Sequence, residues 1–423
     1  MYMISYTSNI NTSCWYWCVI IFIINVVTGF HYIDTGKSIS FNATFINVKP
    51  MFTFITSSPI LNQCQYTLPS ITLNIGTPQQ QYTFIISTET YLSYIIHYNT
   101  TTTSATFTYD NATLNDLVNG HYHSYKLYGY IGKDIMRVDS SNEISFAFIN
   151  VNESDNTCDN IGISGSIGIM KKYMSVYDRI YSNENYSFIN TLEEHDVIDK
   201  RRFAFDFTSE DDIRHEVTFG KRYANLSYCD SSYRYLSNIW YCDFIGVKYD
   251  NEVIVSTEEI MYFETQFPYI ILSDKTGKAV FERLLLKYTM CNTHQSDNKE
   301  FIVCEDVNNS IMHEQLVFMF DHNVEVVIKL SDIYQHGVLM LFRELGGDAS
   351  SFGAVVFKNR IVVFDQEAKA IGFSEYHIHT HTPIHNNSNY STYKKQMYVL
   401  IIISNCLCII LMLFVTYQKV CNI

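Results

Sequence analysis

The sequence predicts an all-β protein, large enough for two lobes, with few and short helices. Of its 423 residues, 15% are aromatic and 17% are charged, and only 6 are proline. This composition is typical of a packed chain and argues against disorder over most of the length. Runs of β-branched and aromatic residues, separated by Asn, Asp or Gly, favour strands. The clearest runs are 66–75, 202–207, 324–330 and 360–364.

Helical patterns are few. The segment 279–290 (AVFERLLLKYTM) has the apolar spacing of a helix, and shorter candidates lie near Leu114 and Met170. So few helices, placed so late, disfavour a parallel sheet whose strands alternate with helices. The net charge of −14 has the wrong sign for neutralising phosphates, which disfavours nucleic acid as a partner.

Both ends of the chain indicate a membrane. The apolar run 14–27 is short and precedes small residues, which predicts a signal peptide over 1–29. An uncleaved anchor is the alternative, because no Lys or Arg precedes the run. The uncharged stretch 398–417 is long enough for one transmembrane helix, between a polar stalk (376–397) and a short tail (418–423). We expect a single-pass type I protein of the secretory pathway or cell surface, with its bulk lumenal or extracellular.

Six cysteines lie between the two apolar ends, an even number that fits an oxidising compartment. They are Cys64, Cys158, Cys229, Cys242, Cys291 and Cys304. Pairing Cys229 with Cys242 and Cys291 with Cys304 would close short loops, which leaves Cys64 for Cys158. None of the spacings fits a zinc site. Sequons such as Asn42 and Asn225 are compatible with a glycosylated, lumenal chain.

Residues 71–86 read ITLNIGTPQQQYTFII, in which Pro78 fixes one turn dihedral and Gly76 permits a tight reversal between two apolar strands. Further segments follow: 163–168 (ISGSIG) and 351–374 (SFGAVVFKNRIVVFDQEAKAIGFS). In these motifs the chain resembles the pepsin-like aspartic proteases (peptidase A1), and its layout is similar to that of their membrane-anchored apicomplexan members.

The resemblance implies a bilobal, all-β pepsin-like fold, followed by the C-terminal transmembrane helix. It assigns 66–200 to an N-terminal lobe and 201–375 to a C-terminal lobe. Residues 30–65 then form an N-terminal extension that is similar to a propeptide.

Proteases of this family use two carboxylates that face each other across the lobes. One is ionised and one protonated, because two like charges a few ångströms apart cannot both ionise. Each belongs to an Asp-Thr/Ser-Gly turn after an apolar strand. Aligned on this motif, Ser87 takes the first catalytic position and Glu89 that of the turn glycine. In the second lobe the alignment places Ser273 at the catalytic position, and a slip of one residue would place Asp274 there instead.

Other candidates surround these positions. The triplet Asp34-Thr35-Gly36 spells the motif but precedes the Gly-Thr-Pro turn, so we interpret it as accidental. The resemblance places Tyr122 at the family's flap tyrosine, and it places Tyr94 where many relatives have Trp, lining the cleft or packing the lobe. We interpret His121 and His123, which flank the flap tyrosine, as solvent-exposed side chains.

With serine at both catalytic positions, the sequence predicts a pseudoprotease that binds an extended peptide in the inter-lobe cleft, without a cofactor or metal. Two alternatives stay open. One is an active aspartic endopeptidase in which Asp274, with Asp34 or Glu89, rebuilds a site. The other is a surface adhesin that uses the outer face.

Overall fold

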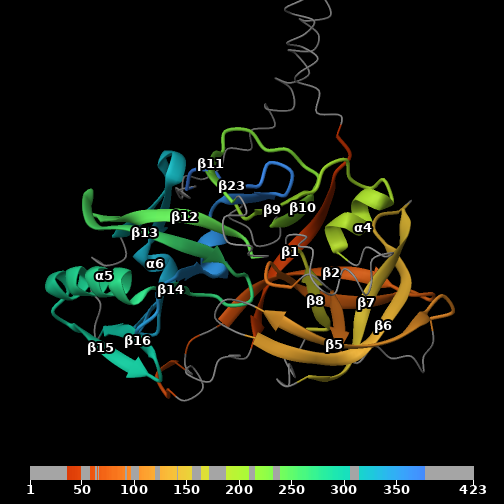
Figure 1. Ribbon diagram of the computed structural model, residues 1–423, viewed down its shortest axis with the longest axis horizontal. Helices are drawn as coiled ribbons and strands as arrows, with labels where there is room; N and C mark the ends of the chain where they lie inside the picture. Colours follow the sequence, from red (N-terminus) through yellow and green to blue (C-terminus); the bar gives the residue numbers. More distant parts are fainter. Residues whose placement is uncertain are drawn as a thin grey trace, which may run out of the picture. The chain divides into compact units, whose positions relative to one another are not determined.

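The computed structural model describes residues 36–48, 58–61, 64, 66–90, 93–96, 104–119, 124–140, 142–154, 163–170, 187–208, 215–231, 239–304 and 314–376. Within them the chain is mostly β with few helices, which confirms the predicted fold class (Figure 1). The described strands form two continuous sheets, each built around one lobe.

The first lobe is a sheet of strands between residues 66 and 168. They are β2 (Tyr66–Ile75), β3 (Gln80–Ser87), β4 (Tyr94–Ile96), β5 (Thr108–Asn119), β6 (Ser124–Arg137), β7 (Glu143–Ser154) and β8 (Gly165–Gly168). Their order is β2-β3-β8-β4-β7-β6-β5, which places β5 at the end of the sheet. Gly76, which opens the turn between β2 and β3, has a φ of 90°, a conformation that strongly favours glycine. The last four residues of β3 are all buried, so this strand ends inside the molecule at Ser87.

The second lobe is a sheet of strands between residues 241 and 352. They are β12 (Tyr241–Tyr249), β13 (Glu252–Phe263), β14 (Ile270–Leu272), β15 (Cys291–Ser296), β16 (Lys299–Cys304), β17 (Gln315–Phe320), β18 (Val324–Lys329), β19 (Tyr334–Gln335), β20 (Val338–Glu344) and β21 (Ser350–Phe352). Their order is β15-β16-β20-β14-β21-β13-β12-β17-β18, and β19 pairs with β20. The short helix α6 (Leu330–Ile333) and the 3₁₀ turns η5 (Asp321–Asn323) and η6 (Ala354–Phe357) complete this part.

A group of strands from the start, the middle and the end of the described chain links the lobes. They are β1 (Ile39–Val48), β9 (Arg202–Asp206), β10 (Glu216–Phe219), β11 (Ser227–Asp230), β22 (Ile361–Asp365) and β23 (Ala370–Phe373), with the helix α4 (Phe188–Glu194) nearby. Residues 39–42 of β1 pair with β10, and residues 43–48 pair with β2. Strand β1, which lies in the predicted N-terminal extension, therefore joins the linking strands to the first lobe.

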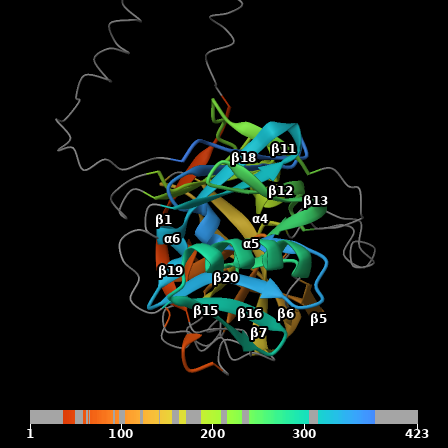
Figure 2. The same cartoon turned by 90° about the vertical axis from the view of Figure 1, so that its left-hand side faces the viewer.

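Helix α5 (Asp274–Lys287) has clear sequence signals at both ends. Ser273 is its N-cap and accepts a hydrogen bond from Thr276 N–H at 3.2 Å. Asp274 in the first turn and Lys287 in the last complement the helix dipole. The helix lies beside β20 (Figure 2) and confirms the helix predicted over 279–290, with an earlier start.

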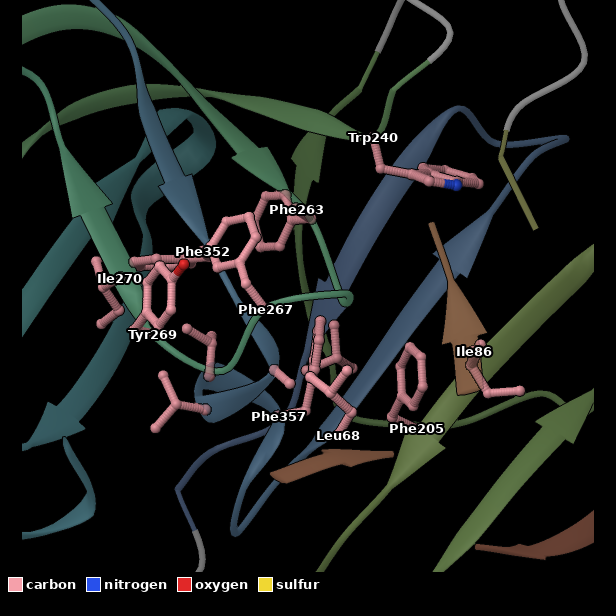
Figure 3. Packing of buried hydrophobic residues seen from close by; sticks show 14 of the residues in the cluster. Leu68, Ile86, Phe205, Trp240, Phe263, Phe267, Tyr269, Ile270, Phe352 and Phe357 are labelled. Carbon is pink, nitrogen blue, oxygen red and sulfur yellow. The ribbon is translucent and has the colours of Figure 1, made fainter. Parts of the chain in front are cut away.

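The core is rich in aromatic side chains (Figure 3). Phe203 stacks on Phe364 with ring centroids 4.7 Å apart, and Trp240 meets Phe203 edge-on at 5.7 Å. Trp240 Nε1 also donates to the carbonyl of Ile169, just beyond β8, at 3.1 Å. This bond ties the start of the second lobe to the end of the first.

Two of the predicted helices are not confirmed. Leu114 lies in β5, where alternation along a hairpin strand outweighs the local helical spacing. Met170 is in irregular backbone, and the residues after it lie outside the described part.

The structure confirms the disulfides Cys229–Cys242 and Cys291–Cys304. Cys64 is a buried free thiol, and its predicted partner Cys158 lies outside the described residues. The predicted signal peptide, the transmembrane segment and all of the stalk but its first residue, Tyr376, also lie outside them. Among the residues that are described, no helix is long and apolar enough to span a bilayer.

Truncating Phe41 in β1 tests whether this strand is integral to the fold. Its ring is 8% exposed and packs against Phe188 and Phe219, so Phe41→Ala is expected to lower the free energy of unfolding by about 3 kcal/mol. Chemical denaturation measures this, with Asn47→Ala, exposed on the same strand, as the control. Equal stability of the two variants would show that β1 is dispensable.

Candidate functional site

Two loops follow strands that hold matching places in the lobes. In the first lobe β3 pairs in parallel with β8, and in the second lobe β13 pairs in parallel with β21. The last apolar pairs are Ile86 with Ile167 and Phe263 with Phe352. The next residue is Ser87 in the first lobe and Glu264 in the second. By register, Ser87 and Glu264 are therefore equivalent, and we call residues 87–90 and 264–266 the junction loops.

A reciprocal pair of threonines holds the junction loops together. Thr88 N–H donates to Thr265 Oγ1 at 3.0 Å, and Thr265 N–H donates to Thr88 Oγ1 at 3.1 Å. Each hydroxyl also donates to a carbonyl of the other lobe, Thr88 Oγ1 to Phe263 O at 2.8 Å and Thr265 Oγ1 to Ile86 O at 2.6 Å. Both threonines are fully buried. Four hydrogen bonds thus join the lobes at their centre.

The residues after the threonines also reach across, one from each lobe. Glu89 Oε1 accepts the backbone N–H of Gln266 at 2.8 Å, and Gln266 Nε2 donates to Ser87 Oγ at 2.6 Å. Glu89 is 0% exposed and Gln266 is 2% exposed. Their side chains fill the space between the junction loops.

The Ser87 hydroxyl is saturated by this network. It donates to Glu89 Oε2 at 3.0 Å and accepts from Gln266 Nε2. It also accepts the backbone N–H groups of Glu89, at 3.3 Å, and of Thr90, at 3.1 Å. Because Ser87 is fully buried and its oxygen already has these partners, it is not poised to attack a substrate.

Glu264 reaches a serine that has a counterpart in the first lobe. Ser351 Oγ donates to Glu264 Oε2 at 2.7 Å. Ser166 in β8 and Ser351 in β21 lie opposite equivalent residues, two places before their junction loops. In the described part of the chain, Ser166 Oγ is buried and has no hydrogen-bond partner. Ser87 is too short to serve Ser166 as Glu264 serves Ser351, so a longer acidic side chain at position 87 would supply the missing acceptor.

Burial raises the pKa of Glu89 to about 7, against an ordinary value of 4.5. The hydrogen bonds from Gln266 N–H, from Ser87 and from Thr88 lower it again, but by less than burial raises it. The proton of the Thr88 hydroxyl is shared with Phe263 O, at 2.8 Å against 3.2 Å to Glu89 Oε2. The carboxyl group therefore has two full donors, Gln266 N–H and Ser87 Oγ, which do not offset burial, so its neutral form prevails up to about pH 7.

The structure places Ser273 and Asp274 away from the junction loops. Ser273 caps α5 through Thr276 N–H, and its own N–H donates to Ser350 Oγ at 3.0 Å. Asp274 Oδ1 forms an ion pair with Arg343 Nη2 at 2.6 Å, which occupies the carboxylate that was predicted to rescue a site. The counterpart of Ser87 is Glu264, in place of the predicted Ser273.

The motif alignment selected the wrong segment in the second lobe, because the sequence around Ser273, the N-cap of α5, resembles that of the first junction loop. The run Ile-Leu-Ser-Asp-Lys-Thr resembles Ile-Ile-Ser-Thr-Glu-Thr, whereas Phe-Glu-Thr-Gln keeps only the threonine of the motif. The sequence did contain a signal for the correct loop. Thr265 comes just after the apolar end of a long strand, and Thr88 has the same place after its own strand.

Other predicted positions are only partly described. Tyr94 is 2% exposed in β4, so it packs the first lobe. Tyr122, His121, His123 and Asp34 lie outside the described residues. Within the described ranges, no group of three or more His, Cys, Asp or Glu side chains is placed to hold a metal ion.

A hollow of about 770 Å³ lies in the second lobe, between β13 and the start of α5. Glu258 and Glu259 line one side, and Lys275, Lys278 and Asp348 line the other. Glu259 is held by three hydroxyl groups, those of Thr257, Thr276 and Ser350. No residue of the junction loops lines this hollow, so it is separate from them.

Comparison with known proteins supports the resemblance. The model of the eukaryotic aspartyl protease family matches residues 69–376. A search of curated proteins found no match for the chain.

Replacing Thr88 or Thr265 by Val tests the reciprocal pair. Each change leaves a buried N–H and a buried carbonyl without partners, so each is expected to cost about 2 kcal/mol of unfolding free energy. The double variant should cost less than the sum, by about 1 kcal/mol or more, because the two hydroxyls lie 3.3 Å apart and either change alone already loosens the contact between the same two loops. Chemical denaturation of the four proteins measures the coupling.

The matched control is the pair Thr72 and Thr83, whose hydroxyls meet at 3.4 Å on the exposed face of the first lobe. The same cycle there should be additive and small. Additive costs at Thr88 and Thr265 would show that the two threonines act independently, which would contradict their coupling across the lobes.

Glu89 should make the protein less stable as pH rises. Because its folded-state pKa is raised, its stabilising contribution is complete below about pH 4.5 and is lost as pH rises through about 7. The loss is on the order of 3 kcal/mol. Glu89→Gln should flatten this part of the stability curve, as measured by denaturation between pH 4.5 and 8. An unchanged slope in Glu89→Gln would assign the pH dependence to other groups.

Proposed function

We propose that this chain, which belongs to the eukaryotic aspartyl protease family, is a non-catalytic member that binds an extended polypeptide without cutting it. One observation carries the proposal. Ser87 and Glu264 stand at the matching ends of β3 and β13, and Glu89 and Gln266 fill the space between them.

Peptide hydrolysis by this family requires two facing carboxylates that share a proton and activate water. A serine hydroxyl at one of the two positions cannot ionise in the working pH range, so it provides neither the base nor the acid. Loss of one positioned acid or base typically costs about 100- to 10,000-fold in rate. The orphaned Ser166 hydroxyl supports the view that position 87 has lost a longer side chain.

Binding by strand addition is supported by the first lobe. Strand β5 stands at the end of the sheet order and, among the described strands, pairs with β6 alone. An edge strand offers unpaired N–H and C=O groups to which an extended peptide can add. The β5–β6 hairpin has the place of the family's flap in the sequence resemblance, so the bound peptide would lie beneath or along it.

We also propose that the chain resides in the secretory pathway or at the cell surface as a type I membrane protein. The disulfides Cys229–Cys242 and Cys291–Cys304 support an oxidising compartment. The uncharged stretch 398–417 supports a membrane anchor.

An active acid endopeptidase is the second candidate. The favouring observation is that each junction loop does carry a carboxyl group, Glu89 in one and Glu264 in the other, and that the pKa of Glu89 is about 7. Against it, both carboxyl groups are fully buried and hydrogen-bonded within the protein. Asp274 is not a partner in this candidate, because Arg343 holds it.

Cleavage and binding can be measured on the same full-length protein. We expect no cleavage of a peptide library between pH 3 and 7, in an assay that pepsin passes as positive control. Cleavage that is blocked by a statine-type inhibitor and abolished by Glu264→Gln would establish the second candidate instead.

For binding, hydrogen–deuterium exchange of the protein with saturating library peptides should show new protection of the amides in β5. Protection confined to the outer face of the second lobe, with none in β5, would contradict strand addition and favour an adhesin.

A further inference from the structure

We infer that Glu89 makes the contact between the lobes a proton-operated lock, closed when its carboxyl group is neutral and loosened when it is ionised. The lock is a property of the junction loops and goes beyond the proposed binding role. It rests on one side chain whose carboxyl group accepts a backbone N–H of the other lobe while it stays bonded to hydroxyls of its own.

Glu89 couples the lobes directly. Its Oε1 accepts Gln266 N–H at 2.8 Å, and its Oε2 lies 3.4 Å from Thr265 Oγ1. On its own side, Oε2 meets the hydroxyls of Ser87, at 3.0 Å, and Thr88, at 3.2 Å. Moving the second lobe away would remove the contacts to Gln266 and Thr265 and admit water to the carboxyl group.

The charges around Glu89 do not compensate an ionised carboxylate. None of its hydrogen-bond partners among the described residues is a cation. The facing loop carries a second acid, Glu264, which receives a hydrogen bond from Ser351 Oγ of β21. The next titratable group of that segment is the buried Tyr269, whose pKa burial raises well above its ordinary value. Among the described residues, a negative charge on Glu89 is therefore opposed by desolvation and has no hydrogen-bonded cation to offset it.

The number of hydrogen-bond donors around Glu89 explains why its carboxyl group is neutral when the lobes are in contact and ionised when they separate. The hydroxyls of Thr88 and Thr265 donate at shorter distances to Phe263 O and Ile86 O than to Glu89. A neutral Glu89 needs fewer donors than an ionised one, and it can itself donate to a neighbouring hydroxyl oxygen. The raised pKa of about 7 agrees with this count of donors. Ionisation is then favoured in any arrangement that exposes the carboxyl group to water.

Amide hydrogen exchange of the full-length protein between pH 5 and 8 tests the lock. The N–H groups of Thr88, Thr265 and Gln266 are each bonded across the lobes, so their protection reports lobe separation. After correction for intrinsic exchange, opening at these amides should rise by roughly one to two orders of magnitude across this range, with its bend near pH 7. Amides in the β2–β3 ladder should show no such rise.

Two variants separate the lock from general stability. Glu89→Gln keeps the shape of the side chain and should make the protection of the three amides independent of pH. The control Glu252→Gln removes an exposed carboxylate that pairs with Arg283, and it should leave the wild-type profile intact.

The wild-type profile alone can overturn the inference, even where Glu89→Gln fails to fold. Junction amides whose protection does not change with pH, or changes in step with the β2–β3 amides, would show that Glu89 does not gate the lobes. A pH-dependent profile that persists in folded Glu89→Gln would assign the gate to Glu264.

Discussion

The reciprocal hydrogen bonds between Thr88 and Thr265 are the constraint on which the rest of the arrangement depends. Each threonine must present its N–H and its hydroxyl to the other at about 3 Å, while its hydroxyl proton reaches a carbonyl across the lobes. These bonds form only when the two loops lie at the same depth within their lobes and run in opposite directions where they meet. The matched pairing of β3 with β8 and of β13 with β21 supplies that geometry.

The same constraint holds the shape of the junction independently of the side chains beside each threonine. The threonine bonds use backbone groups and two hydroxyls, so they do not depend on what precedes or follows each threonine. Glu89 and Gln266 add further bonds across the junction and use their length to do so. A buried polar network that is fully connected stabilises a specific arrangement, whereas a partly connected one is costly. In the described part of the chain, the network is incomplete at two buried hydroxyls without partners, those of Ser166 and Thr90.

Much of the fold followed from local patterns. Strand β2 coincides with the predicted run 66–75, because alternation and β-branched residues dictate a half-buried strand there. The pairs Cys229–Cys242 and Cys291–Cys304 followed from short loops. The second junction loop could not be predicted in this way, because its sequence retains only one residue of the expected motif. It is identified by the pairing between β13 and β21, and the order of residues along the chain does not reveal that pairing. Ser273 was misleading since a helix cap and a strand-end turn both favour serine followed by polar residues.

The two lobes differ at equivalent positions of their junction loops, and this difference bears on function more than either loop does alone. In the second lobe, Glu264 carries a carboxyl group that accepts a hydrogen bond from Ser351. The first lobe has Ser87 in the equivalent place, and the carboxyl group of Glu89 in the same loop accepts the backbone N–H of Gln266 in the facing loop. A dyad works because two acids share one proton, and two acids that each hydrogen-bond to separate protein groups do not share it. The carboxyl groups that remain at the junction therefore affect how closely the lobes approach each other. In the proposed lock, the ionisation of Glu89 controls the contact between the two threonines.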